Sequence, residues 1–416
     1  MSKRRALIVG GSLGGIFAAH LLRGVGWDAV VFEKNPEELA SRGVGIGTHP
    51  QLIAVMRRIG IDFDETMGTR PQKVVCLDRS GKIILERPTV RTMSGWGRLY
   101  RALRDRLPDE SYRLAMELTR VEQDAGGVTA VFADGSRERG DLLVGADGFR
   151  STVREQFLPD LKPRYAGYVA WRGMLDESDV PRDIWEEIFE LYSFCLPEGE
   201  QMLAYAMPGR NNETQVGRRS YTIVWYHPTH PDALADLCTD ASGRHHGIAI
   251  PPPLIRPEVI AGIKATARAL VAPQLAEIFS RTQPFFNAIF DLESQQIVFG
   301  RVALLGDAAF VARPHVGAGV TKAALDGACL ADALKIAGGD IAAGLAQYQR
   351  EQQPFGSEIV ALGRAQGAYL SAQIKPREQR TEAELHRDID DVILAHSNRS
   401  DQVRGIVTRR GLDAHF

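Results

Sequence analysis

The sequence predicts an α/β protein with two domains and a C-terminal helical segment, and three observations support this. At 416 residues, the chain is too long for one ordinary hydrophobic core. Short apolar strands at 5–9 and 28–33 flank a helical pattern, as in a parallel sheet buried on both faces. Aromatic, β-prone segments separated by turns fill much of 163–282 and indicate a second, antiparallel sheet.

The composition excludes several classes of protein. Apolar residues make up 44% and charged residues 25% of the chain, and the net charge is -2, so no basic excess suggests a nucleic-acid partner. No apolar run reaches the roughly 18 residues of a membrane span. The 4 cysteines are scattered, without the spacing of a disulfide scaffold or a metal site, so we expect no metal and a cytoplasmic location.

The remaining elements follow from local patterns. We expect helices at 14–23, 50–59 and 98–107, a hairpin at 73–88 and further strands between 118 and 146. The predicted first domain is discontinuous and consists of residues 1–72, 97–162 and 283–350. The second domain consists of residues 73–96 and 163–282, and the C-terminal helices of residues 351–416.

The stretch "ALIVGGSLGGIFAA" predicts a dinucleotide site at the first strand-to-helix turn. Gly10, Ser12 and Gly15 occupy the three glycine positions of a Rossmann-type fingerprint, and the acid Glu33 ends the next strand. Such a turn directs a helix N-terminus at a pyrophosphate, while the acid accepts hydrogen bonds from a ribose. The predicted contacts are Gly10, Gly11, Ser12, Leu13, Gly15, Glu33 and Lys34.

Two further motifs lie far along the chain. "DLLVGADGFRSTVRE" contains Asp147-Gly148, and "RVALLGDAAFVARPHVGAG" contains Asp307 and then Pro314, Gly317 and Gly319. In the latter, a buried strand is followed by an acid and by glycines, which allow unusual backbone conformations. A strand with a purely structural role needs neither feature.

In this order, the three motifs resemble those of the group A flavoprotein aromatic hydroxylases, which share the para-hydroxybenzoate hydroxylase fold. The resemblance implies FAD, with its ADP part on the first motif, its ribityl chain on Asp307 and its ring edge along Pro314, Gly317, Ala318 and Gly319. The resemblance also implies that Asp147-Gly148 takes part in the function of both FAD and NAD(P)H, and that the loop containing Gly45 lies beside the flavin. Segments 165–173, 203–211 and 312–319 resemble members that hydroxylate pyridines.

Two positions depart from the pattern that many relatives show. Trp96 stands where many carry arginine, and Phe310 where many carry histidine, so family contacts at these positions do not carry over.

The chemistry that the resemblance implies is ring hydroxylation. NAD(P)H reduces FAD, O2 adds to give a flavin hydroperoxide, and a hydroxylated aromatic ring of pyridine or phenol type takes up the oxygen. The candidates for a base or a hydrogen-bonding group are His49, His315 and Tyr205. Each has a plain alternative as a core or loop-orienting residue. The glycines of the 43–49 loop, Gly43, Gly45 and Gly47, would allow the flavin to move.

Other functions stay open at this point. The substrate could be another phenol or N-heteroaromatic ring. A flavin halogenase is disfavoured because the sequence lacks a WxWxIP motif, and an NAD-dependent dehydrogenase would not need the second and third motifs. A non-enzymatic flavin-binding regulator is a further alternative. The expected partners are a small aromatic substrate and O2, with no membrane and a possible homodimer.

Overall fold

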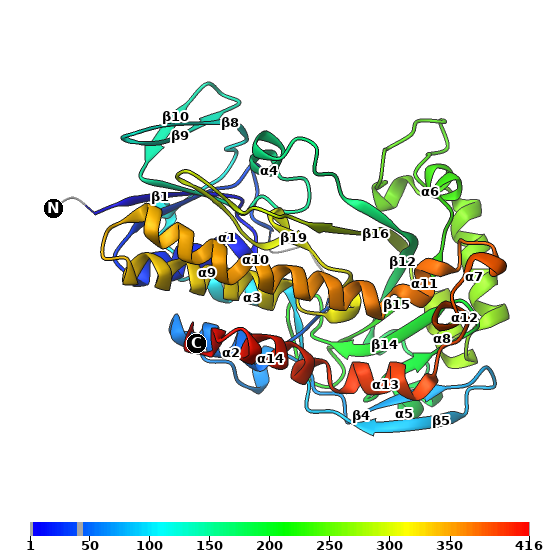
Figure 1. The fold of residues 1–416 in the computed structure, drawn as a ribbon. Coiled ribbons are helices and arrows are strands. Elements are labelled where there is room, and N and C mark those ends of the chain that lie inside the picture. Colours follow the sequence, from blue (N-terminus) through cyan, green and yellow to red (C-terminus); the bar gives the residue numbers. More distant parts are fainter. Residues whose placement is uncertain (1–2, 40–44, 416) are drawn as a thin grey trace.

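The computed structural model describes residues 3–39 and 45–415, and Gly43 therefore lies outside the described residues. Within that part of the chain, the fold is mixed α/β and is built around two large sheets (Figure 1). No helix among the described residues has both the length and the apolar character needed to cross a membrane.

The first large sheet has six strands in the order β17-β18-β11-β1-β2-β7. Neighbouring strands run parallel, except that β17 is antiparallel to β18. This confirms the parallel α/β unit expected from the buried apolar strands. The bounds are β1 Arg5–Val9, β2 Asp28–Phe32, β7 Tyr112–Arg113, β11 Leu142–Gly145, β17 Val298–Phe299 and β18 Val302–Leu304.

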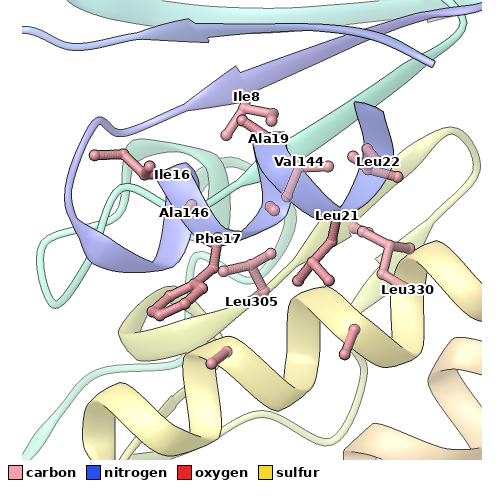
Figure 2. Close-up of a cluster of buried hydrophobic side chains, with 14 of the residues drawn as sticks. Ile8, Ile16, Phe17, Ala19, Leu21, Leu22, Val144, Ala146, Leu305 and Leu330 are labelled. Atoms are coloured by element: carbon pink, nitrogen blue, oxygen red, sulfur yellow. The ribbon is translucent and has the colours of Figure 1, made fainter. Parts of the chain in front are cut away.

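Helices α1 (Leu13–Gly24) and α9 (Gly319–Ile336) pack together on this sheet. Figure 2 shows the apolar side chains between them, among them Phe17, Leu21 and Leu305, all almost fully buried. Gly327 of α9 permits the close approach, because a Cβ there would lie 3.1 Å from Leu21 Cδ1. The packing brings the third motif, which precedes α9, next to the first.

The second large sheet has eight strands in the order β19-β16-β12-β15-β14-β13-β4-β5. The prediction of an antiparallel sheet holds for every neighbouring pair except β13 and β4, which are parallel. The bounds are β4 Lys73–Leu77, β5 Ile83–Pro88, β12 Arg164–Asp176, β13 Tyr192–Cys195, β14 Gln201–Met207, β15 Ser220–Pro228, β16 Phe285–Glu293 and β19 Phe310–Val311.

The two faces of this sheet have different partners. Alternate residues such as Trp171 and Trp225 pack against helices on one face. Their neighbours along the strands, such as Tyr168 and Tyr226, form a second cluster on the opposite face. The helices in this part of the chain are α5 Arg182–Ile188, α6 Pro231–Leu237, α7 Pro257–Leu270 and α8 Pro273–Arg281.

Smaller elements complete the core. A three-stranded sheet has the order β10-β9-β8, and β3 pairs with β6 in a two-stranded sheet. The bounds are β3 Gly45–Gly47, β6 Met93–Gly95, β8 Leu118–Asp124, β9 Gly127–Phe132, β10 Arg137–Gly140, α2 Pro50–Arg58, α3 Trp96–Arg104 and α4 Thr152–Phe157.

The C-terminal helices run back over both large sheets (Figure 1). Helix α13 lies on β4 and β5, where Arg87 and Asp390 form an ion pair 2.5 Å apart, and α14 packs on α10. The bounds are α10 Ile341–Gln366, α11 Ala368–Ala372, α12 Glu382–Leu385, α13 Ile389–Ser397 and α14 Arg399–Arg409.

Two of the expected segment boundaries do not coincide with the edges of structural elements. Strand β16 (Phe285–Glu293) pairs with β12 in the eight-stranded sheet, although it follows the expected boundary at residue 283. The boundary at 351 falls inside α10, because that helix continues through Pro354.

Candidate active site

The turn between β1 and α1 has the geometry that its glycines predict. Gly10 has a φ of +105°, and a Cβ there would lie 2.4 Å from the Ala146 carbonyl oxygen. A Cβ on Gly15 would lie 1.9 Å from the Gly10 carbonyl oxygen, so both positions require glycine. Ser12 is extended and precedes the helix, where its hydroxyl makes no capping hydrogen bond.

Glu33 closes the other side of this turn. Its carboxylate is buried and accepts hydrogen bonds from the backbone N–H of Gly11 at 2.7 Å and of Asn35 at 2.9 Å. The acid therefore holds the turn and borders the cavity beside it. That first cavity is lined by Val9, Gly10, Ser12, Phe32, Glu33, Lys34, Asn35, Leu39, Met116, Glu117, Leu118, Ala146, Asp147, Gly148, Arg150 and Thr152.

The second motif joins this cavity to the third motif. Asp147 accepts hydrogen bonds from the Ser151 hydroxyl at 2.5 Å and from the Val153 N–H at 3.1 Å, and burial raises its pKa. Arg154 of the same segment donates to the carbonyl oxygen of Ala308, 3.2 Å away. The helix that follows Asp147 is thereby tied to the turn that contains Asp307.

Asp307 follows β18 at the carboxyl end of the parallel sheet, where ligands of such sheets bind. Its side chain is exposed to a second cavity, and no hydrogen-bond partner for its carboxylate is found among the described residues. Desolvation by the protein around the cavity is the main cause of its raised pKa. Below it, Lys322 and Asp326 form a buried ion pair with 3.2 Å between Nζ and Oδ2.

The second cavity lies between the eight-stranded sheet, the small sheet of β3 and β6, and the segment that leads into α9. Gly317 has a φ of +61°, and α9 begins after Ala318 with no side-chain cap and no acid in its first turn. The lining is Gly45, Ile46, Gly47, Met93, Arg172, Tyr192, Leu203, Tyr205, Val224, Tyr226, Asp307, Ala312, Arg313, Pro314, Gly317, Ala318, Gly319, Val320 and Arg399.

Comparisons with known proteins agree with this geometry. The chain is 30% identical to the 2,6-dihydroxypyridine 3-monooxygenase of Paenarthrobacter nicotinovorans, over 79% of this chain and 82% of that protein. It is also 30% identical to the FAD-dependent urate hydroxylase of Klebsiella pneumoniae, over 84% and 85% of the two chains.

The chain belongs to the group A FAD-dependent aromatic hydroxylases. A family model described as FAD binding domain-like matches residues 165–291. The solved structure of 2,6-dihydroxypyridine-3-hydroxylase from Arthrobacter nicotinovorans has a TM-score of 0.83 and 26% identity, covering 93% of this chain and 97% of that one.

FAD, the cofactor of this hydroxylase family, fits the residues present. Helices α1 and α9 both begin at these cavities without an acid in the first turn or a side-chain cap, which leaves their N–H groups available to anionic parts of a ligand. The Asp307 carboxylate is available to a hydroxyl of a polyol chain.

Of the three catalytic candidates, only Tyr205 lines the second cavity. It lies on β14, and a Cβ on Gly45 would approach its ring to 2.9 Å, so glycine permits this packing. Burial raises the pKa of Tyr205, and its hydroxyl is therefore neutral.

His49 and His315 lie behind the cavity wall, each about 1% exposed. His49 Nε2 donates to the Gly317 carbonyl oxygen at 3.0 Å, and His315 Nε2 lies 2.8 Å from the Tyr168 hydroxyl. Burial lowers the pKa of each imidazole to about 3, so both are neutral at pH 7. Their catalytic roles stay a prediction.

Three arginines at or beside the second cavity are not among the residues predicted from the sequence. Arg172 of β12 and Arg399 of α14 line the cavity, and Arg91 lies next to it, 5.9 Å from the Tyr192 ring. Arg172 lies in the segment "YAGYVAWRG", whose alternating pattern could have indicated that it shares a face with Tyr168. No local pattern distinguishes Arg399 from the exposed arginines of its helix.

Proposed function

We propose that this chain is an FAD-dependent monooxygenase that uses NAD(P)H and O2 to hydroxylate an electron-rich aromatic ring, a hydroxylated pyridine or a related N-heteroaromatic compound. The observation that carries the proposal is the continuity of the second cavity. Its lining joins Asp307 and the start of α9, which fit the flavin, to Tyr205 and Tyr226 on the sheet face of the second domain. Similarity to relatives that act on 2,6-dihydroxypyridine and urate supports the substrate class.

In this proposal, the cofactor supplies the activated oxygen, while the chain binds the cofactor, orients the substrate ring and shields both from water. The β1–α1 turn with Gly10, Gly11, Ser12, Leu13 and Gly15 binds the pyrophosphate, and Glu33 with Lys34 binds the adenosine ribose. Asp307 accepts a hydrogen bond from the ribityl chain, and Pro314, Gly317, Ala318 and Gly319 lie along the ring system.

The walls of the cavity orient the substrate. Leu203 and Val224 provide an apolar surface for a flat ring, and the Tyr205 hydroxyl provides a neutral hydrogen-bonding group. His49, as a donor to the Gly317 carbonyl oxygen, acts as a positioning residue for the loop before α9. Tyr168 and His315 support that loop from below. Asp147-Gly148 connects the FAD half of the site to the approach of NAD(P)H.

A pair of stoichiometries tests the function. Purified protein is expected to bind FAD without a covalent link and to oxidise NAD(P)H slowly until 2,6-dihydroxypyridine or another hydroxylated pyridine is added. Hydroxylated product and hydrogen peroxide are then measured per NAD(P)H consumed. The proposal is rejected if FAD does not bind, or if NAD(P)H oxidation stimulated by the ring compounds gives peroxide alone.

The assembly and location belong to the same proposal. Strand β5 is the last strand of the eight-stranded sheet; Ile83 and Ile84 are exposed on it, and Val90 is exposed just after its end. Pairing of β5 with its copy would give a two-fold homodimer, which light scattering of the protein and of Ile84→Lys would test. The four buried, unpaired cysteines support a reducing, cytoplasmic setting.

A further inference from the structure

A cluster of side chains with metal-binding groups lies where α9, α10 and the end of the chain meet. It contains the Cys329 thiol on α9, the Glu351 carboxylate on α10 and the imidazole of His415, in the short helix Leu412–His415. Each group offers one ligand atom, and the three atoms lie within 4.8 Å of one another. None of the three residues lines the first or the second cavity, so the cluster is separate from the flavin and substrate site.

The distances within the cluster suit a single ion. Glu351 Oε2 accepts a hydrogen bond from Cys329 Sγ at 3.0 Å and lies 3.2 Å from His415 Nε2. In a tetrahedral zinc site, bonds of about 2.0–2.3 Å place neighbouring ligand atoms roughly 3.3–3.6 Å apart. A zinc ion would therefore need only small side-chain movements, once the thiol has lost its proton.

Burial and charge also favour zinc. Cys329 is fully buried, His415 is 8% exposed and the Glu351 side chain is 29% exposed. A thiolate and a carboxylate together balance the charge of Zn²⁺, and a neutral imidazole adds none, so the filled site would have no net charge inside the protein. Sulfur and imidazole ligands suit zinc, whereas magnesium and calcium prefer oxygen.

The surrounding residues orient the ligands as they do in metal sites. His415 Nδ1 lies 2.9 Å from Asp332 Oδ2, which leaves Nε2 facing Glu351. A histidine that binds a metal usually donates its other ring N–H to a carboxylate in this way. Arg58 pairs with Asp332 at 2.6 Å and also donates to the His415 carbonyl oxygen. The second oxygen of Glu351 accepts a hydrogen bond from Gln347 at 3.0 Å.

Gln352 gives a second, independent indication of a ligand. Its side chain is 1% exposed, yet neither its amide oxygen nor its amide nitrogen has a hydrogen-bond partner among the described residues. Burial is the main cause of the raised pKa of the Cys329 thiol, and the Gln352 amide acts on that thiol in the opposite direction, so the two groups are close. An ion at the cluster would give this buried, unpartnered amide oxygen a partner.

We propose that Cys329, Glu351 and His415 bind one zinc ion. The Gln352 amide oxygen is the fourth ligand, and the thiol proton passes to solvent as the ion binds. Four protein ligands make a closed site, as in structural zinc sites, so the ion has no part in the hydroxylation chemistry. Its role is to fasten the end of the chain to α9 and α10. It thereby holds α14, whose first residue, Arg399, lines the second cavity.

The scattered cysteines predict no metal site from the sequence alone, because zinc sites are usually recognised by closely spaced cysteines and histidines. This cluster needs only one cysteine. Its other ligands come from a different helix and from the end of the chain, so no spacing along the sequence indicates it.

Metal titration of the purified protein tests the proposal. The protein is treated with a chelator and titrated with Zn²⁺, and in a second arm with Co²⁺, whose absorbance reports its ligands. One equivalent of Zn²⁺ per chain is expected to bind, to release protons and to raise the midpoint of thermal unfolding. Bound Co²⁺ is expected to show a charge-transfer band from a thiolate and the visible bands of four-coordinate cobalt, at wavelengths longer than oxidised flavin absorbs.

Variants assign these signals to the cluster. Cys329→Ser is expected to remove the charge-transfer band, and His415→Gln to weaken binding of both metals. Asp332→Asn changes only the group behind the imidazole and is expected to weaken binding about 10- to 100-fold. Cys238→Ser is the matched control, because Cys238 is also a fully buried free cysteine but packs in the core of the eight-stranded sheet. It is expected to bind both metals as the wild type does.

Limited proteolysis tests the structural role. Zn²⁺ is expected to slow cleavage of the C-terminal segment in the wild type but not in His415→Gln. The proposal is overturned if Co²⁺ shows no thiolate band, if the band survives in Cys329→Ser, or if saturating Zn²⁺ changes neither the thermal midpoint nor the cleavage rate. None of these measurements requires hydroxylation, so a failure of the proposed function would leave their outcome unaffected.

Discussion

The buried Lys322–Asp326 pair beneath Asp307 allows a sharp test of how the third motif is supported. The two side chains are 1% and 2% exposed, with 3.2 Å between Lys322 Nζ and Asp326 Oδ2. The pair also holds the Gly306 peptide, because Lys322 donates to its carbonyl oxygen at 2.8 Å and Asp326 accepts from its N–H at 2.8 Å. Removing the acid alone would therefore leave a buried cation and an unpaired N–H group.

Two variants separate these contributions. Asp326→Leu is expected to lower the free energy of unfolding by about 3–5 kcal/mol, the usual loss when one member of a buried pair is removed. The double variant Lys322→Met with Asp326→Leu also removes the cation, so only the unsatisfied Gly306 groups remain, at a cost of about 1–3 kcal/mol.

Urea unfolding of the FAD-free protein, followed by tryptophan fluorescence, measures both changes. Glu155→Gln is the control, because its pair with Lys162 is exposed to solvent and is expected to contribute little to stability. The reasoning is refuted if the double variant is no more stable than Asp326→Leu, or if Asp326→Leu behaves like the control.

Three further predictions concern the cofactor site and the C-terminus. Asp307→Ala is expected to weaken FAD binding about 10- to 150-fold, measured by titration of the FAD-free protein, with little change in the urea midpoint, because one charge-assisted hydrogen bond is lost. Ser12→Gly is expected to retain FAD and Ser12→Val to lose it, since a branched side chain would crowd the pyrophosphate; normal FAD content in Ser12→Val would contradict the assignment. In the metal-free protein, hydrogen bonding to Asp332 raises the pKa of His415, so its stabilisation of the C-terminus is complete below the unfolded value of about 6.5 and is lost as pH rises through the folded value. Limited proteolysis of the C-terminal segment should therefore accelerate at alkaline pH, and His415→Gln should remove this dependence.

The cofactor half of the site could be predicted because its signals are local. Gly10 and Gly15 are required by contacts within one strand–turn–helix unit, and Asp307 is recognisable because it ends an apolar strand. Each feature lies within a few residues of the element that explains it. The order of the three motifs then indicates how the pieces assemble.

The substrate half depends on contacts between distant segments. Arg399 reaches the cavity only because α14 returns over α10 and next to Gly317, and nothing in the sequence of that helix indicates this path. His49 and His315 are predicted as cavity residues because the family resemblance implies that their loops lie beside the flavin. In the fold, they are directed instead at Gly317 and Tyr168.

Through these contacts, the loop before α9 links the cofactor half of the site to the substrate half. Gly317 receives a hydrogen bond from His49 on the first-domain side and is approached by Arg399 from the C-terminal helices. Its left-handed backbone places α9 so that the helix begins at the second cavity. A side chain at residue 317 would therefore disturb the backbone turn, the Arg399 position and the start of α9 together. Gly317→Ala is expected to weaken FAD binding and hydroxylation of the ring substrate in parallel, whereas Arg399→Gln should leave FAD binding unchanged. If Gly317→Ala changes one without the other, the two halves of the site are not coupled through this loop.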